Sequence, residues 1–103
     1  MTHGVTNKKP TECTTIEEVR NEIDNIDRTI IELLSERFQY VKEVVKYKDN
    51  TPESIVAEDR RKVVLECRRR WAEEKGLSPD VIEKMYVDLI QYFIDEEMKI
   101  KNK

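Results

Sequence analysis

Residues 16–48, IEEVRNEIDNIDRTIIELLSERFQYVKEVVKYK, decide the fold of this chain. Apolar residues recur there at intervals of three and four, which is the spacing of one face of an α-helix. The members of this apolar stripe are Ile16, Val19, Ile23, Ile26, Ile30, Leu33, Val41, Val44 and Val45. Because no glycine or proline interrupts the stretch, it predicts a single long helix.

One position of the stripe carries Arg37 where an aliphatic side chain is expected. A guanidinium on a buried helix face is costly unless an anion meets it. Two later stripes repeat the pattern, with Arg60 in phase with Val64 and Glu97 in phase with Phe93. Three helices that each aim one ionisable group inward predict a polar pocket in a helical bundle. The alternatives are a core arginine paired with a glutamate and, for Glu97, a solvated acidic face.

Two breaks divide the rest of the chain into two shorter helices. Thr51-Pro52 predicts a helix start, with a start near Ser54 as the alternative, and Gly76 predicts the end of that helix. Ser78-Pro79 predicts the start of a third helix, which continues to about residue 99.

The first helix begins at a capping sequence. Thr14 or Thr15 offers an N-cap side chain, and a glutamate follows each of them three residues later, as in a capping box. We therefore expect residues 1–12 to be a disordered leader and residues 13–103 to form one helical domain.

Composition argues against several classes of protein. Charged residues make up 40% of the chain and the net charge is −3, which argues against a dedicated nucleic-acid binder. The triplet at 68–70, three arginines, does not form a one-sided patch because successive helical side chains point about 100° apart. Cys13 and Cys67 lack metal-ligand spacing, and no apolar run can span a membrane. We expect no metal, no cofactor, no nucleic-acid or membrane partner and a cytoplasmic location.

The long helix also predicts the assembly. About 33 residues at ~1.5 Å each make a rod of roughly 50 Å, whereas a compact domain of this size has a radius of gyration of only ~13 Å. Two short helices cannot cover such a stripe, so we expect a homodimer in which the long helices pair. An ordinary coiled coil is the alternative, but a strict seam does not usually carry Arg37, Tyr40 and Tyr47.

Several cations have a spacing that suits an anionic ligand. Arg37 and Lys48 are eleven residues apart, about three helical turns, so a continuous helix would project both from one face. Arg20 is rotated by roughly 100° from Arg37 and is better placed to serve a partner's pocket in a dimer. Arg60 adds a further cation from the second helix. Without a glycine-rich loop for phosphate, these cations predict a small dicarboxylate as the ligand.

Five pieces of the sequence carry a likeness to a known family. They are VRNEID at 19–24, LLSER at 33–37, VKEVVKYK at 41–48, WAEEKGL at 71–77 and QYFIDEEMK at 91–99. Together they resemble the all-helical type II chorismate mutases, and the last two resemble the isochorismate pyruvate lyase branch in particular. The resemblance covers about residues 11–100.

The resemblance implies an all-α fold with one long and two shorter helices per chain in an intertwined homodimer with two active sites. Arg37, Lys48, Arg60 and Glu97 of one chain, with Arg20 of the partner subunit, would bind the substrate. Lys48, Glu97 and Arg37 would be the catalytic residues, and Lys48 would contact the ether oxygen of the substrate.

The chemistry that the resemblance implies is pericyclic and needs no nucleophile, metal or cofactor. The first expectation is that chorismate rearranges to prephenate while the site holds the enolpyruvyl side chain over the ring. The alternative is an isochorismate pyruvate lyase, which releases pyruvate and salicylate. A second alternative is a non-catalytic helical dimerisation or regulatory module.

Three positions depart from the family pattern. Glu97 stands where the family usually carries a glutamine, and a carboxyl group donates a hydrogen bond only when it is protonated. We therefore expect activity to fall as pH rises and Glu97→Gln to flatten that dependence. Arg61 and Ala57 stand where the mutases usually have a glutamate and an aspartate, which favours the lyase reaction.

Overall fold

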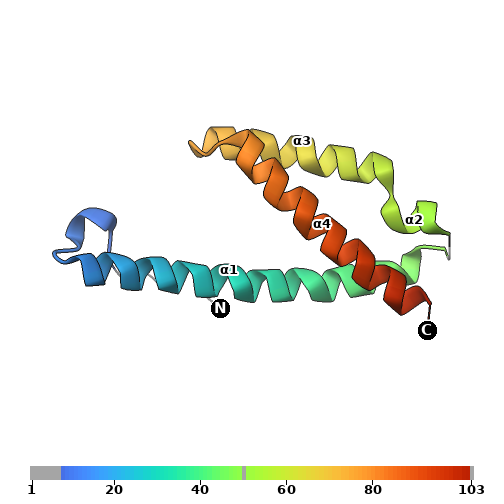
Figure 1. Ribbon diagram of the computed structural model, residues 1–103, viewed down its shortest axis with the longest axis horizontal. Coiled ribbons are helices and arrows are strands. Elements are labelled where there is room, and N and C mark those ends of the chain that lie inside the picture. Colours follow the sequence, from blue (N-terminus) through green and yellow to red (C-terminus); the bar gives the residue numbers. More distant parts are fainter. Residues whose placement is uncertain (1–7, 50, 103) are drawn as a thin grey trace. The chain divides into compact units, whose positions relative to one another are not determined.

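All regular secondary structure is helical in the part of the chain that the structure, a computed structural model, describes, residues 8–49 and 51–102. The elements, with η for a 3-10 helix, are η1 (Pro10–Glu12), α1 (Ile16–Val44), η2 (Val45–Tyr47), α2 (Pro52–Val56), α3 (Glu58–Glu74) and α4 (Pro79–Lys101) (Figure 1). The predicted all-α class is confirmed. The chain forms two units, Met1–Gln39 and Tyr40–Lys103. None of the helices in the described ranges combines the length and the apolar character that a membrane crossing needs.

The start of α1 is closed by the predicted capping residues. The Thr15 hydroxyl accepts a hydrogen bond from the Glu18 N–H at 3.1 Å, and the Glu18 carboxylate accepts one from the Thr14 N–H at 2.7 Å. The Thr14 N–H and then the Lys8 ammonium, 3.0 Å away, lower the pKa of Glu18 to about 2 because both stabilise the anion. Of the leader expected over 1–12, residues 1–7 lie outside the described ranges.

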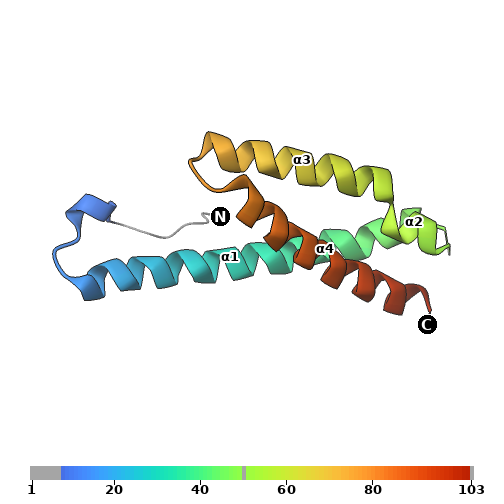
Figure 2. The ribbon, with the colours of Figure 1, turned by 45° about the horizontal axis from the view of Figure 1, so that its top comes forward.

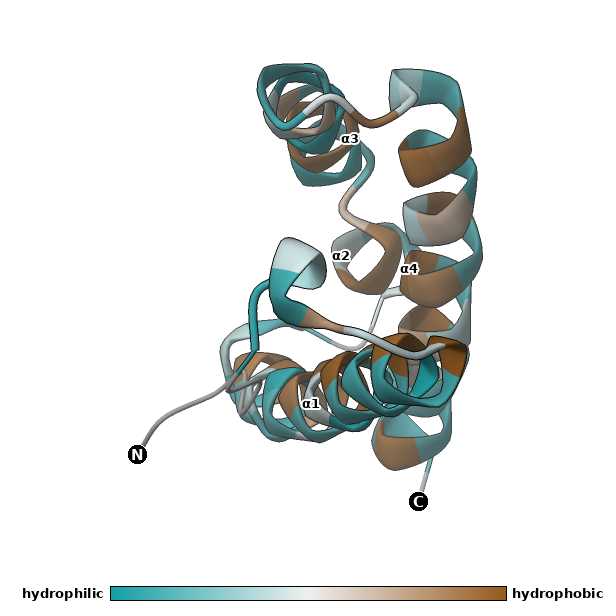
Figure 3. Cartoon of the chain, turned by 90° about the vertical axis from the view of Figure 1, so that its left-hand side faces the viewer, coloured by the Kyte–Doolittle hydropathy of each residue, from teal (hydrophilic) through white to brown (hydrophobic). Residues whose placement is uncertain are grey.

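The apolar stripe of the first unit is exposed to solvent. Its large apolar residues keep between 39% and 57% of their accessible surface; they are Ile16, Val19, Ile23, Ile26, Ile30 and Leu33. Figure 3 shows the apolar and polar segments alternating along α1. Burying one such side chain contributes about 1.5–3 kcal/mol, so leaving all of them in water forgoes a large stabilisation.

The long helix ends four residues earlier than predicted. α1 stops at Val44, η2 tightens the next turn, and Lys48 has an extended backbone with φ −102° and ψ 147°. Its N–H still closes the 3-10 turn on the Val45 carbonyl at 3.2 Å. The prediction that Arg37 and Lys48 share one helical face is therefore wrong, because helical geometry does not reach Lys48.

The predicted second helix is in fact two helices, α2 and α3. The Thr51 hydroxyl accepts from the Ser54 N–H at 3.2 Å, which confirms the start at Thr51-Pro52. Ala57 then adopts a left-handed conformation, with φ 48° and ψ 62°, and α3 begins at the next residue. A left-handed residue with a Cβ costs about 1–2 kcal/mol, and it changes the helical phase between the two helices.

The second unit is built around α4. This helix packs against α3, α2 and η2, and Figures 1 and 2 show α3 and α4 as an antiparallel hairpin. Gly76, with φ 76°, ends the first arm in the left-handed conformation, and the Ser78 hydroxyl caps α4 by accepting from the Val81 N–H at 3.3 Å. Both features follow the prediction. The buried apolar residues are Val45, Ile55, Val64, Ala72, Phe93 and Ile94.

Candidate functional site

An ion pair between a half-buried lysine and a buried glutamate joins the segment after η2 to the last turns of α4. The Lys48 Nζ lies 2.8 Å from Oε1 of Glu97, and the two side chains keep 18% and 6% of their accessible surface. The residues are 49 positions apart in the sequence and belong to the same unit. They are the two predicted site residues that the second unit brings into contact.

Lys48 is held by its side chain and by its backbone. Its ammonium also donates to the backbone carbonyl of Ile55, the last-but-one residue of α2, at 2.9 Å. Its own carbonyl accepts from the Nζ of Lys101 at 2.7 Å. An ammonium has three N–H donors, and among residues 8–49 and 51–102 the Lys48 ammonium uses two of them, on Ile55 and Glu97.

Glu97 faces the interior because of its position on α4. It lies one turn after Phe93, which is also buried, and it keeps only 5% of its accessible surface. Its near neighbour Asp95 is exposed. The solvated-face alternative for Glu97 is therefore wrong. A buried carboxylate is tolerated only with a partner, and the Lys48 ammonium supplies it.

The other predicted site residues lie on different parts of the chain. Arg20 and Arg37 lie on α1 within Met1–Gln39, where Arg20 is exposed and Arg37 is half-buried. Arg60 lies in the first turn of α3 and is exposed. Its predicted inward position is not met within one chain, although Arg60 lies one turn before the buried Val64 on the same helix.

The segment between Lys48 and Ile55 carries its own hydrogen bonds. The Asp49 carboxylate accepts from the hydroxyl and the N–H of Thr51 at 2.6 and 2.9 Å, and the Asp49 N–H donates to the Ser54 hydroxyl at 3.2 Å. The two bonds from Thr51 lower the pKa of Asp49 below its usual range by stabilising the charged form. These local contacts hold Asp49, the residue next to Lys48, against Thr51 and Ser54.

Sequence reasoning missed two groups that contact Lys48, the Ile55 carbonyl and the Lys101 ammonium. A backbone acceptor leaves no trace in residue type, so the first could not be found from the sequence. The second had a signal, because Lys101 follows Glu97 by four residues and therefore lies on the same face of a helix.

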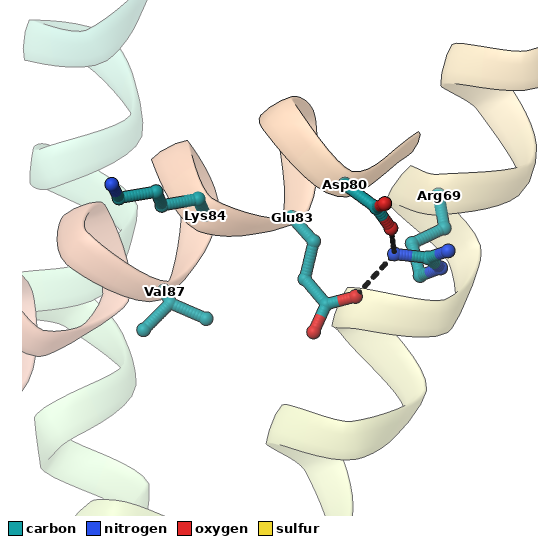
Figure 4. Close-up of a pocket in the computed structure, with 5 residues that line it drawn as sticks. All are labelled: Arg69, Asp80, Glu83, Lys84 and Val87. Carbon is teal, nitrogen blue, oxygen red and sulfur yellow. Dashed lines mark hydrogen bonds and ion pairs between the residues drawn. The ribbon is translucent and has the colours of Figure 1, made fainter. Parts of the chain in front are cut away.

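A second polar cluster fastens α3 to the start of α4. The Arg69 Nη1 lies 2.8 Å from Oδ1 of Asp80 and 2.6 Å from Oε1 of Glu83 (Figure 4). Hydrogen bonding to Asp80 first, then to Glu83, raises the pKa of Arg69. An open hollow of about 310 Å³ lies here, lined by Arg69, Asp80, Glu83, Lys84 and Val87. Since one guanidinium bridges both carboxylates, the cluster acts as a clamp between the helices.

A comparison with known families places the ion pair in context. Residues 19–98 match the family described as chorismate mutase type II. The chain belongs to the chorismate mutase type II family. The matching range contains both Lys48 and Glu97, whereas Lys101 lies beyond its end.

Three relatives show how this type II chorismate mutase domain compares with known proteins. The isochorismate pyruvate lyase of Pseudomonas aeruginosa is 36% identical over 92 residues, which cover 89% of this chain and 90% of that protein. The T-protein of Haemophilus influenzae is 34% identical over 84% of this chain. The bifunctional chorismate mutase/prephenate dehydratase of Buchnera aphidicola is 27% identical over 82% of it. The chain spans only 22% of each of the last two proteins.

The Lys48–Glu97 pair predicts a distinctive pattern of stability changes. Glu97→Leu leaves the Lys48 ammonium without its anion and should lower the free energy of unfolding by about 3 kcal/mol, whereas Glu97→Gln keeps an acceptor and should cost less. Adding Lys48→Met to Glu97→Leu should recover part of the loss. Urea unfolding measures these changes. The control is Glu96→Gln, because Glu96 forms a more exposed pair with Lys99. This substitution should lower the free energy of unfolding by at most about 1 kcal/mol. Equal effects of Glu97→Leu and Glu96→Gln would contradict the assignment.

Proposed function

We propose that this chain is a chorismate mutase-type pericyclic enzyme that acts on a small cyclic dicarboxylate without a covalent intermediate. The observation that carries the proposal is the Lys48–Glu97 pair in a chain of the type II family. The pair presents a fixed ammonium in a partly desolvated position, where a charge interacts more strongly than it does in water.

Substrate binding in this proposal depends on cations from several elements. Arg37, Lys48 and Arg60, with Arg20 of the partner subunit, bind the two carboxylates of the substrate. Guanidinium groups suit this role because each can donate two parallel hydrogen bonds to one carboxylate. Holding both carboxylates folds the enolpyruvyl side chain over the ring, which brings the reacting carbons together before the reaction.

Lys48 has the central role in the chemical step that we propose. In the mutase reaction the ether C–O bond breaks while a C–C bond forms between the enolpyruvyl methylene and the ring, so every atom is retained. Negative charge grows on the ether oxygen as its bond to the ring breaks. The third N–H of Lys48 stabilises that charge, Glu97 orients the ammonium, and Arg37 stabilises the charge on the enolpyruvyl side.

The lyase reaction is the second candidate, and two observations favour it. The chain spans 90% of an isochorismate pyruvate lyase but only a fifth of the longer relatives. Arg61 and Ala57 replace the acidic residues that we expected of a mutase. In this reaction the same ether bond breaks and a ring hydrogen moves to the methylene carbon. Pyruvate is released, and the ring becomes the aromatic ring of salicylate. The same cations serve both reactions.

We also propose a homodimer of residues 13–103 in the reducing cytoplasm. The exposed apolar stripe of α1 supports a partner, because a second copy can bury it across a two-fold axis. In such a dimer the exposed Arg20 contributes to substrate binding in the pocket of the other subunit. The two free cysteines, Cys13 and Cys67, suit a reducing compartment.

The dimer is tested by charging the stripe. Ile23→Glu should raise the dimer dissociation constant at least tenfold, since burial of each isoleucine contributes about 1.5–3 kcal/mol and symmetry counts it twice. Asp24→Ala, at an exposed neighbour outside the stripe, should leave it unchanged. Sedimentation equilibrium measures the molecular mass in solution. A wild-type chain that is monomeric at about 10 µM would refute the dimer.

The activity is tested by offering the wild-type protein chorismate and isochorismate separately. Loss of chorismate absorbance reports prephenate formation, and fluorescence reports salicylate. Arg37→Ala should lower kcat/KM by about 10²–10³ with an unchanged circular dichroism spectrum, because a group that stabilises transition-state charge is lost. Arg28→Ala, an exposed arginine of the same helix, is the control. A non-catalytic module would convert neither compound, and Arg37→Ala would alter only its stability.

A further inference from the structure

The last helix contacts Lys48 at two separate points. Glu97 accepts from the Lys48 ammonium at 2.8 Å, and one turn later Lys101 donates to the Lys48 backbone carbonyl at 2.7 Å. Residues four apart on a helix project from the same face, so both contacts come from one face of α4. The two ends of a single lysine are thus bound to one rigid element.

This arrangement matters because Lys48 lies outside any helix. Its backbone is extended, so the helical ladder does not hold its carbonyl. A lysine side chain has a flexible four-carbon stem, and the direction of its ammonium depends on where the backbone starts. The Lys101 bond fixes that starting point against the same helix that binds the ammonium. Lys101 is itself half-buried, as suits a group whose ammonium reaches back into the structure.

We propose that Lys101 is a positioning residue for the reaction, acting through Lys48. By holding the Lys48 carbonyl, it sets the direction in which the third N–H of the Lys48 ammonium meets the substrate. The inference rests on the proposed function, since it deepens the role of the same site. Lys101 lies outside the matching range 19–98, so the assignment comes from this structure and not from the family match.

A purely local role for Lys101 is the competing explanation. Cations in the last turn of a helix interact favourably with its dipole, and Lys99 in the same turn is available for that role. Lys99 has 73% of its side chain exposed and pairs with Glu96 at 3.0 Å. It shares the charge and the helix turn of Lys101 but lacks the contact with Lys48, so it is a matched control.

The test compares Lys101→Met, Lys101→Arg and Lys99→Met in the full chain. Methionine keeps the length of the side chain but removes the donor, whereas arginine keeps a donor. With the substrate that the wild type converts, Lys101→Met should lower kcat about 10- to 100-fold with KM changed less than threefold, because displacement of a reacting group by about 1 Å costs on that order. Lys101→Arg should restore kcat to within about fivefold, and Lys99→Met should match the wild type.

A second readout separates this inference from the proposed function. Amide hydrogen exchange at Lys48, Asp49 and Ile55 should be at least tenfold faster in Lys101→Met than in Lys99→Met. If the wild type converts neither substrate, the proposed function fails and the exchange rates alone decide whether Lys101 holds this segment. Unchanged kcat or unchanged exchange in Lys101→Met would overturn the inference. Should Lys101→Met not fold, Lys101→Gln replaces it, with the same outcomes required.

Discussion

The ion pair between Lys48 and Glu97 is the constraint on which the second unit depends. The Glu97 side chain keeps only 6% of its accessible surface, so its carboxylate requires a cation such as the half-buried Lys48 within hydrogen-bonding distance. That requirement ties the residue after η2 to the last turns of α4. The Ile55 carbonyl adds α2 to the same contact, so three elements meet at one ammonium. The result is a cation whose position is determined before any ligand arrives.

The irregular backbone around the pair serves this placement. α1 gives way to a 3-10 turn and then to an extended residue, which sends the Lys48 side chain back towards α4. The N–H groups of Asp49, Thr51 and Ser54 each donate a hydrogen bond to a side chain of this segment. Ala57 then adopts a left-handed conformation, which changes the direction of the chain before α3 begins. By contrast, the Arg69 cluster at the far end of α4 joins two helices through one guanidinium that contacts two carboxylates.

A pericyclic mechanism is compatible with such a site because it requires no nucleophile from the protein. The reacting atoms all belong to the substrate, and the protein contributes orientation and a stabilising charge. The mechanism that we propose uses the Lys48 ammonium, arginines for the carboxylates of the substrate and the apolar stripe of α1 for dimerisation. Whether the product is prephenate or salicylate depends on how the ring is held. The replacement of acidic side chains by Arg61 and Ala57 bears on that point.

The sequence by itself determined the helical class, the Ser78 cap and the stop at Gly76, and it narrowed the other two helix starts and the face of Glu97 to two alternatives each. These follow from spacing and from local hydrogen bonds, which depend on neighbouring residues only. Only the tertiary structure decided that α1 stops short of Lys48, that Arg60 is exposed in the single chain, and that Lys101 and the Ile55 carbonyl hold Lys48. Those features arise from contacts between residues distant in the chain, which leave no periodic signal in the sequence.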